Sequence, residues 1–229
     1  TPAFVLKLFK SIAKDLLIDS ISSINIDIMN FLSIDCSTDL FSLFIKTKNK
    51  TFNKILQSDK SNIDSLMKNI LDFLNENNLS FADISSIFVN QGPGNFSGLR
   101  GSLSIAKGIC ISKNLALFGY NTFLWSCAEF LNKKNNICSI IRFREKYFLE
   151  IFDNSLNTVF KPKEITKDEI IENYGKKFKV IPSNIKKNFD DQILKLNNLS
   201  VVKLDHNRLE SLQLRGLLDK DLIKPLYLS

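Results

Sequence analysis

Residues 90–100, NQGPGNFSGLR, place three glycines and a proline between an apolar run and a long segment rich in small residues. The preceding residues 86–89, SIFV, are typical of a buried strand, and residues 97–113 have the composition of a helix. A strand, a glycine-rich turn and a helix in this order predict an α/β protein. The turn opens a helix, where free N–H groups can hold an anion.

The glycine-rich turn does not match the common nucleotide-binding motifs. A P-loop requires Lys-Ser or Lys-Thr after its last glycine, and neither follows here. The dinucleotide fingerprint requires G-x-G-x-x-G, whereas Gly92, Gly94 and Gly98 place the third glycine one residue too late. Pro93 also removes an N–H donor from the turn. We therefore expect this turn to shape the backbone.

The helix after the turn carries an unusual number of small residues. Glycine inside a helix costs about 1 kcal/mol relative to alanine, so several of them indicate that another backbone comes close. Two interpretations remain open: close packing on the protein's own sheet, or a tight helix–helix contact with a partner. The small residues are Gly98, Gly101, Ser102, Ser104, Ala106 and Gly108.

The rest of the chain supports the α/β prediction. Strands are expected at residues 30–35, 40–46, 50–56 and 115–120, and a hairpin is expected around Arg144–Glu145 from the apolar runs 137–143 and 146–152. Apolar residues at helical spacing predict a helix over residues 61–77, and further helices are expected at 122–131 and 167–175. Residues 177–183 form an expected strand, and residues 185–220 are ambiguous.

Charge and rare residues exclude several classes of protein. The net charge is +7, which favours an anionic partner such as RNA, although only five of the 31 basic residues are arginine. The single histidine, His206, excludes the paired-histidine zinc motifs and leaves one weak route to a Ser-His-Asp site. Four scattered cysteines without a C-x-x-C pair predict reduced, buried thiols. No apolar stretch is long enough to predict a membrane span.

Residues 31–39, FLSIDCSTD, place an aspartate at the end of a strand, followed by small hydroxyl residues. This turn resembles the phosphate-binding hairpin of the actin-like ATPases. The resemblance implies that Asp35 faces a metal-bound phosphate and that Ser37 and Thr38 offer hydroxyl and N–H groups to it. The glycine usual in that hairpin is missing, so a plain turn is the other interpretation.

Three motifs together resemble the TsaB family, also called YeaZ. They are FLSIDCSTD, the central GPGNFSGLRGSLSIAKGI and the closing KPLYLS. The family pattern is close to D-T-S-T, then G-P-G-S-F-T-G-L-R-I-G, then P-x-Y-L-R. The match runs from Met29 to Ser229 in order and spacing. It departs from the pattern at Gly101 and Ser102, and Ser229 stands where the closing arginine is usual.

The resemblance implies an α/β protein of the actin-like ATPase fold (acetate kinase, Hsp70, actin and ribonuclease H-like) with two small subdomains, the second degenerate. Residues 29–125 would form the first subdomain and residues 126–229 the second. Residues 1–28 are expected to be an N-terminal extension without chemistry.

By the same resemblance, the chain is a non-catalytic paralogue of TsaD. It would pair with TsaD, and with the ATPase TsaE, to place a threonylcarbamoyl group on adenosine 37 of tRNAs that read ANN codons. TsaD-like proteins carry a His-x3-His metal site, which a chain with one histidine cannot form. The implied protein is cytoplasmic, forms a homodimer when alone and meets tRNA through the complex.

The implied site is a partner interface, with no catalytic residue and no metal. Two helices, about residues 61–77 and 97–113, would form the face that packs on TsaD. The resemblance implies no tightly bound cofactor, and ATP or ADP with Mg²⁺ only at the interface of the complex. The expected interface and motif residues are Met67, Leu71, Leu74, Gly92, Pro93, Gly94, Phe96, Ser97, Gly98, Leu99, Arg100, Ser104, Lys107 and Gly108.

Two other functions remain as alternatives. An active actin-like phosphotransferase, such as a small sugar or acyl kinase, would use Asp35 as a metal-facing carboxylate. However, residues 126–229 contain only Gly175 and Gly216, too few glycines for a glycine-rich adenosine pocket. An RNA-binding module would use the lysine surplus, but no aromatic-interleaved signature such as that of an RRM is present.

Overall fold

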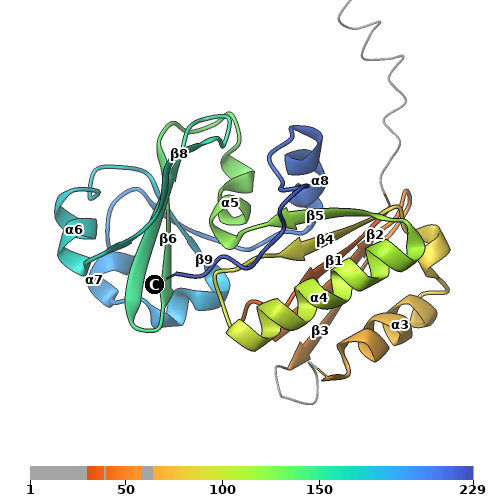
Figure 1. Ribbon diagram of the computed structural model, residues 1–229. Coiled ribbons are helices and arrows are strands. Elements are labelled where there is room, and N and C mark those ends of the chain that lie inside the picture. The colour runs from red at the N-terminus through yellow and green to blue at the C-terminus, as the bar shows by residue number, and fades with distance from the viewer. Residues whose placement is uncertain (1–29, 39, 58–63, 229) are drawn as a thin grey trace, which may run out of the picture.

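Two five-stranded mixed sheets form the framework of the computed structural model, which describes residues 30–38, 40–57 and 64–228 (Figure 1). In the first sheet, β2 is antiparallel to β1 and β3 to β2, whereas β4 and β5 run parallel to β1. The order across the sheet is β3-β2-β1-β4-β5. The strands are β1 (Phe31–Asp35), β2 (Leu40–Lys46), β3 (Thr51–Gln57), β4 (Ser86–Asn90) and β5 (Ala116–Tyr120).

The second sheet repeats this topology. Its order is β10-β9-β6-β7-β8, so β6 takes the central place that β1 has in the first sheet. Here too a three-strand antiparallel meander is followed by two strands parallel to the first. The strands are β6 (Ile137–Phe143), β7 (Lys146–Phe152), β8 (Thr158–Ile165), β9 (Lys179–Pro182) and β10 (Leu199–Val202).

The helices distinguish the two subdomains. The first has α3 (Leu66–Glu76) and the 18-residue α4 (Phe96–Lys113), whereas the second has α6 (Lys167–Glu172) and the four-residue α7 (Asp191–Leu194). The second subdomain is therefore degenerate in its helices, while its sheet is complete.

Helices α3 and α4 cover one face of the first sheet, the near face in Figure 1. The apolar stripe of α3, with Leu66, Ile70 and Phe73, packs into a core with Leu32 and Ile34 of β1. Asn95 caps α4 by accepting a hydrogen bond from the Ser97 N–H at 3.1 Å. Asn114 ends it in the left-handed conformation, at φ 54°.

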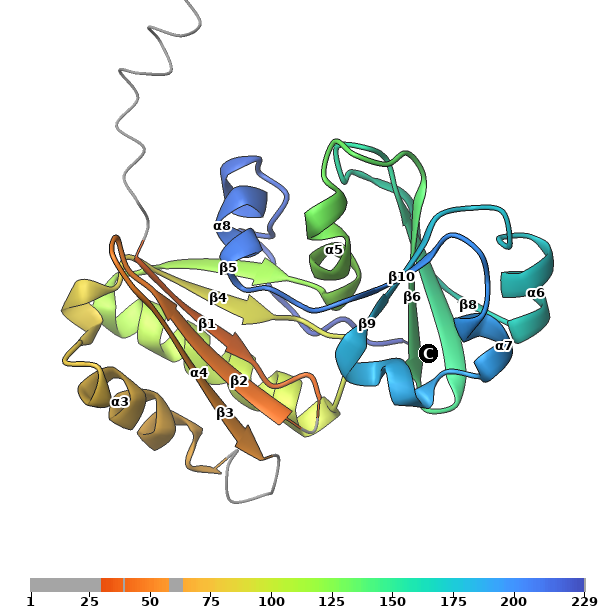
Figure 2. The ribbon, with the colours of Figure 1, turned by 180° about the vertical axis from the view of Figure 1, so that it is seen from behind.

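The other face of the first sheet, seen in Figure 2, packs on an aromatic core shared with the second subdomain. Phe31 and Phe88 stack with ring centroids 4.5 Å apart, and Phe118 meets Phe88 edge-on at 5.3 Å. α5 (Thr122–Cys127) and α8 (Asn207–Leu214) contribute Trp125 and Leu209 to the same core. Because one core spans both sheets, burial of apolar surface holds the two subdomains together.

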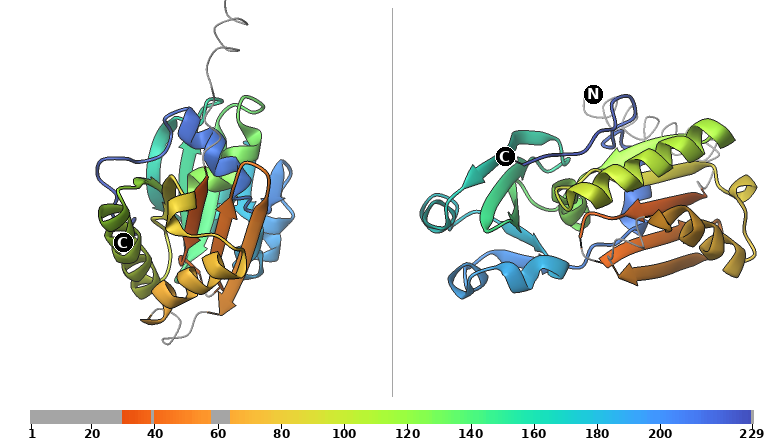
Figure 3. Two further views of the ribbon diagram at one scale, coloured as in Figure 1. Left: turned by 90° about the vertical axis from the view of Figure 1, so that its right-hand side faces the viewer. Right: turned by 60° about the horizontal axis from the view of Figure 1, so that its bottom comes forward.

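The C-terminal segment returns to the first subdomain, as both views in Figure 3 show. Gly119 and Asp219 form an antiparallel bridge. Further along, the Leu226 N–H donates to the Gln91 carbonyl at 2.7 Å, and the Gln91 side-chain amide donates to the Lys224 carbonyl at 3.0 Å. The closing motif therefore lies directly against the glycine-rich turn.

The structure confirms the predicted strands of the first sheet, the long helix after the glycine-rich turn and the hairpin at Arg144–Glu145. The expected helix over 122–131 is α5 followed by a 3-10 turn over Ala128–Phe130. Strand β8 was not predicted, and the ambiguous segment 185–220 contains α7, β10 and α8. The expected boundary between residues 125 and 126 falls inside α5, and the expected extension 1–28 lies outside the described residues.

Candidate functional site: a cavity between the sheets and an exposed helical face

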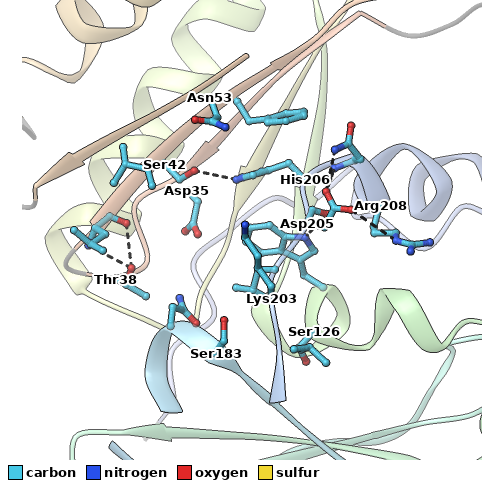
Figure 4. A pocket seen from close by; sticks show the side chains of 18 of the residues that line it. Asp35, Thr38, Ser42, Asn53, Ser126, Ser183, Lys203, Asp205, His206 and Arg208 are labelled. Atoms are coloured by element: carbon cyan, nitrogen blue, oxygen red, sulfur yellow. Dashed lines mark hydrogen bonds and ion pairs between the residues drawn. The ribbon is translucent and has the colours of Figure 1, made fainter. Parts of the chain in front are cut away.

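A cavity of about 720 Å³ lies between the two subdomains (Figure 4). The first sheet contributes Asp35, Ser42 and Phe44 to its wall, and α5 contributes Trp125. The segment between β10 and α8 closes the opposite side. That segment includes Lys203, Asp205 and His206, and Arg208 of α8 lies beside it in the wall. The cavity therefore brings together residues that lie up to 173 positions apart in the sequence, the separation of Asp35 and Arg208.

Asp35 is buried at the carboxyl end of β1. Its Oδ1 accepts hydrogen bonds from the Ser37 N–H at 2.9 Å and from the Asn90 side-chain amide at 3.0 Å. Burial raises the pKa of Asp35, and these hydrogen bonds oppose the shift. The carboxylate is held in place by the turn that follows it, which matches the plain-turn interpretation of this motif.

Asn90 is a central member of this site that the sequence did not single out. Its side-chain amide also donates to Thr122 Oγ1 at 3.1 Å, and its Oδ1 accepts from the Gly92 N–H at 2.9 Å. One buried side chain thus joins the end of β1, the glycine-rich turn and the start of α5. An asparagine at a strand end carries no signal of such a role, because its partners are distant in sequence.

The glycine-rich turn packs directly against the turn after β1. The Asn95 N–H donates to the Ser37 carbonyl at 2.8 Å. A Cβ added to Gly94 would lie 2.0 Å from the Ser37 carbonyl oxygen, and one added to Gly98 would lie 2.2 Å from that of Cys36. Only glycine permits this approach, so the interpretation of close packing within the protein's own fold holds at Gly98, the helix residue of the two.

His206 lies in a chain of neutral hydrogen-bonding groups. Its two ring nitrogens are each 3.0 Å from a serine oxygen, Nε2 from Ser42 and Nδ1 from Ser33. Ser33 continues to the Tyr120 hydroxyl at 3.1 Å. Burial lowers the pKa of His206 to about 4, so the ring is neutral at pH 7. Among the described residues both ring nitrogens have serine partners and neither has a carboxylate partner, so these residues do not form a Ser-His-Asp arrangement at His206.

The residues around Asp35 do not fit a magnesium-bound nucleotide well. The Ser37 N–H, which a phosphate would need, is engaged by Asp35, and the Thr38 hydroxyl donates to the Leu40 carbonyl at 3.1 Å. Among residues 30–38, 40–57 and 64–228, no group of three or more His, Cys, Asp or Glu side chains is placed to hold a metal ion. Asp35, Ser37 and Thr38 do lie together, as predicted, but mainly hydrogen-bond within the turn.

Helices α3 and α4 lie on the same side of the first sheet (Figure 1). Met67 and Leu71 of α3 are 37% and 40% exposed, and Ile111 of α4 is 84% exposed. A groove of about 480 Å³ between the helix ends is lined by Leu71, Phe81 and Lys113. Apolar side chains gathered around a groove are a common mark of a protein contact.

The predicted interface residues divide into two groups. The exposed group is Met67, Leu71, Phe96, Ser97, Arg100, Ser104, Lys107 and Gly108. The second group, in or near the protein interior, is Leu74, Gly92, Pro93, Gly94, Gly98 and Leu99. Leu74, an expected interface residue, is 1% exposed and packs in the core under α3, so of the apolar stripe on α3 it is Met67 and Leu71 that are exposed.

Gly108 differs from the glycines at the start of α4. A Cβ added there would meet no other atom within 4 Å, leaving out the backbone of its own helix. The small-residue helix therefore packs on its own sheet at Gly98 and leaves an open, glycine-containing surface at Gly108. The interpretation of close packing therefore holds at Gly98, and the contact with a partner stays a prediction for the open surface at Gly108.

In the part of the chain that the structure describes, no helix combines the length and apolar character needed to cross a membrane.

The family model and the curated relatives that match this chain all have names that refer to threonylcarbamoyl modification of tRNA. The family model described as "TsaD: tRNA N6-adenosine threonylcarbamoyltransferase" matches residues 56–151. The "tRNA threonylcarbamoyladenosine biosynthesis protein TsaB" of Buchnera aphidicola subsp. Baizongia pistaciae is 32% identical over 84 residues, which are 37% of this chain and 38% of that protein. The protein of the same name from Escherichia coli K12 is 24% identical over 151 residues, 62% of this chain and 64% of that protein.

Solved structures agree on the fold. "YeaZ from Pseudomonas aeruginosa" superposes with a TM-score of 0.65 at 12% identity, covering 88% of this chain and 100% of that one. A second Pseudomonas aeruginosa structure, titled as similar to "peptidase YEAZ", gives a TM-score of 0.67 with the same identity and coverage. The sequence matches span less than two thirds of the length of each of these curated relatives.

Two mixed sheets of identical strand order, facing each other across a cavity, define a two-subdomain protein of the actin-like, ribonuclease H-like ATPase fold. The strand–glycine turn–helix unit is placed as the sequence predicts. The chain is similar to proteins of the TsaB family, also called YeaZ, which are named for tRNA threonylcarbamoyladenosine biosynthesis.

Proposed function

We propose that this chain is a non-catalytic subunit of the complex that transfers a threonylcarbamoyl group to adenosine 37 of ANN-reading tRNAs. It acts by pairing with TsaD, and TsaE joins them as the ATPase. The names of the matched family and relatives support this reaction. The complex works in the cytoplasm, and this chain forms a homodimer through the same face when TsaD is absent.

The observation that carries the proposal is the exposed face of α3 and α4. Three apolar side chains of these helices, Met67, Leu71 and Ile111, are exposed, and Leu71 also lines the groove between the helix ends. Covering such side chains removes about 25 cal/mol of unfavourable free energy for each Å² of apolar surface buried. Gly108 leaves room on α4 for a partner backbone or side chain to approach closely.

The chemistry of the cavity supports a role without catalysis. His206 is neutral at pH 7 and both its nitrogens have serine partners, so it is a poor general base. Asp35 is engaged by its own turn. The alternative, an actin-like phosphotransferase, would need a free phosphate-binding turn and a second metal-facing carboxylate. An ATP or ADP molecule with Mg²⁺ at the interface of the complex remains a proposal for the assembled protein only.

The interface is tested by size-exclusion chromatography with light scattering on the chain mixed with TsaD from the same organism. The wild type should form a one-to-one complex at micromolar concentration. Leu71→Asp and Gly108→Leu should lower its affinity at least tenfold, because one places a charge and the other a bulky side chain in the contact.

Val159→Asp is the matched control, because Val159 is exposed on β8, an edge strand of the second sheet. It should leave the complex intact. A complex that tolerates Leu71→Asp and Gly108→Leu as well as Val159→Asp would refute the helical interface, and no complex at all with the wild type would refute the pairing. ATP turnover by the chain alone would support the phosphotransferase instead.

A further inference from the structure

A second groove, of about 560 Å³, lies between the start of α4 and the tip of the β6–β7 hairpin. We call it the hairpin groove. Pro93, Gly94 and Phe96 line it from the first subdomain. The hairpin contributes Arg142 and Arg144, and a 3-10 helix over Ser183–Asn188 contributes Lys187. It is distinct from the cavity around His206, although the two share Thr38, Leu40 and Asn184.

The wall of the hairpin groove is cationic. Among the described residues it contains Arg142, Arg144 and Lys187 and no Asp or Glu, whereas the neighbouring cavity contains Asp35, Glu129 and Asp205. Arg142 is already paired: it donates to the Asn188 carbonyl and to the Glu145 carboxylate. Within the described residues, neither Arg144 nor Lys187 lies within ion-pair distance of a carboxylate. Two cations are thus free to meet an anion.

The two free cations are fixed on neighbouring backbones. Arg144 and Glu145 both have positive φ, 50° and 64°, and form the tight turn that ends the hairpin. The Arg144 guanidinium lies 5.2 Å from the centroid of the Phe143 ring. The hydrogen bond from Arg142 to Asn188 ties the hairpin to the helix that carries Lys187. Arg142 therefore positions the two elements.

An exposed aromatic surface borders the same groove. Phe96, at the start of α4, is 46% exposed and stacks on Tyr227 with centroids 5.4 Å apart. The Arg100 guanidinium lies 5.0 Å from the centroid of the Phe96 ring. Proteins that bind single-stranded nucleic acid combine cations for the phosphates with aromatic rings for the bases. The hairpin groove and its border supply both kinds of group.

We propose that the hairpin groove binds the phosphate backbone of RNA, which makes this chain a direct contact of the RNA substrate; the inference rests on the proposed function for the identity of that RNA. An RNA strand fits better than a free nucleotide because the free cations come from two separate elements and the aromatic surface is open. From residue 126 onward the chain has 19 Lys and Arg against 14 Asp and Glu, so the wider field is also positive.

The test measures RNA binding by the chain alone, without TsaD, by fluorescence anisotropy over a range of salt concentrations. The probes are an unmodified ANN-reading tRNA transcript and a 12-nucleotide single-stranded RNA, with ATP and pyrophosphate as competitors. The groove variant is Arg144→Glu with Lys187→Glu. Its RNA affinity should fall at least tenfold. The slope of log affinity against log salt should become shallower by about 1.4, because each of the two lost phosphate contacts contributes about 0.7 on a single strand.

The control is Lys133→Glu with Lys134→Glu, an equal change of charge in the loop before β6, at the strand end opposite the hairpin tip. It should weaken RNA binding less than threefold. Arg144→Gln with Lys187→Gln, with circular dichroism to check the fold, covers the case in which the glutamate variant does not fold. The glutamine variant should also lose RNA affinity, by a smaller factor than the glutamate variant.

Three results would overturn the inference: no RNA binding by the wild type, equal losses in the groove and control variants, or binding of pyrophosphate or ATP that RNA does not displace. The last result would identify a small-anion site. Because this assay contains no TsaD, its failure leaves the light-scattering result for the complex untouched. Conversely, a chain that binds RNA through the groove and fails to pair with TsaD would refute only the proposed function.

Discussion

Glu150 is a buried carboxyl group whose two oxygen atoms differ in their hydrogen bonding. It lies on β7, facing the core beneath α5, where its Oε1 accepts a hydrogen bond from Thr158 at 2.9 Å. Its buried Oε2 has no hydrogen-bond donor among the described residues. Burial raises the pKa of Glu150 to about 7, because the charged form loses its hydration. The folded protein therefore holds this proton more tightly than the unfolded chain.

The raised pKa of Glu150 predicts that the stability of the folded protein depends on pH. Between about pH 4.5 and 7 the unfolded chain releases the Glu150 proton first, so the contribution of this residue to stability falls as the pH rises. The loss amounts to about 3 kcal/mol over this range. The Glu150→Gln variant has no titrating carboxyl group at this position, so it should lack this loss of stability. Urea unfolding at pH 5 and pH 8 should show a smaller decrease in stability for the variant, and an unchanged decrease would contradict the prediction.

His206 and Lys179 are buried polar residues with complete sets of partners. His206 is flanked by Ser33 and Ser42. The Lys179 ammonium donates to the Tyr174, Gly175 and Lys177 carbonyls at 3.2, 2.8 and 2.7 Å. Such pairings are expected, since an unpaired buried polar group is costly. They could not be predicted for His206, because Ser33 is 173 residues away in the sequence.

At the scale of elements, the first turn of helix α4 packs against the loop that follows β1. Gly98 approaches the Cys36 carbonyl so closely that a methyl group would overlap it, whereas the region around Gly108 is open. The two glycines occupy one helix, Gly98 in its first turn and Gly108 in its interior, and they differ in what faces them. They therefore form a natural matched pair for separating packing from helix propensity.

Alanine at these two glycines should have opposite effects. Gly98→Ala should destabilise the protein by about 1–3 kcal/mol, because the added methyl group forces α4 away from the β1–β2 turn. Gly108→Ala should stabilise it by up to about 1 kcal/mol, the difference in helix propensity. Chemical denaturation of both variants measures the difference. Equal stabilities would show that the glycine-rich turn does not depend on this contact.

The elements that the sequence predicted are those with strong local signals. The strands of the first sheet are short apolar runs, and α4 follows a turn whose glycines fix its start. Strand β8 was missed because Pro162 interrupts it and most of its residues are exposed, so it lacks the alternating pattern of a half-buried strand. Its position depends on pairing with β7, which is a tertiary effect.

Within the site, the sequence identifies the motifs, but it does not predict which motifs contact each other. The sequence placed Asp35 and the glycine-rich turn in separate motifs, and the structure joins them through Asn90 and Ser37. The closing motif likewise meets the turn through Gln91 and Leu226. These contacts span more than 50 residues, so periodicity carries no trace of them. Leu74 was misplaced because helical spacing alone does not show how far the core extends around α3.

At the scale of the whole molecule, the two subdomains share one topology and differ in their surroundings. The first has two substantial helices with an exposed apolar face, and the second has a complete sheet with short helices and a cationic hairpin. A subunit that binds a protein partner through the first and RNA through the second would act by bringing them together. This account requires no reacting residue in the cavity between the sheets.

The most direct test of the central claim is reconstitution of the tRNA modification. TsaD and TsaE from the same organism are supplied with an ANN-reading tRNA and the threonylcarbamoyl donor, with or without this chain, and threonylcarbamoyladenosine is quantified by mass spectrometry of the digested tRNA. Modification should depend on this chain, and the Asp35→Asn variant should support it to a similar extent. Equal modification without the chain would contradict its role as a subunit, and complete loss in Asp35→Asn, with the complex still formed, would contradict its non-catalytic role.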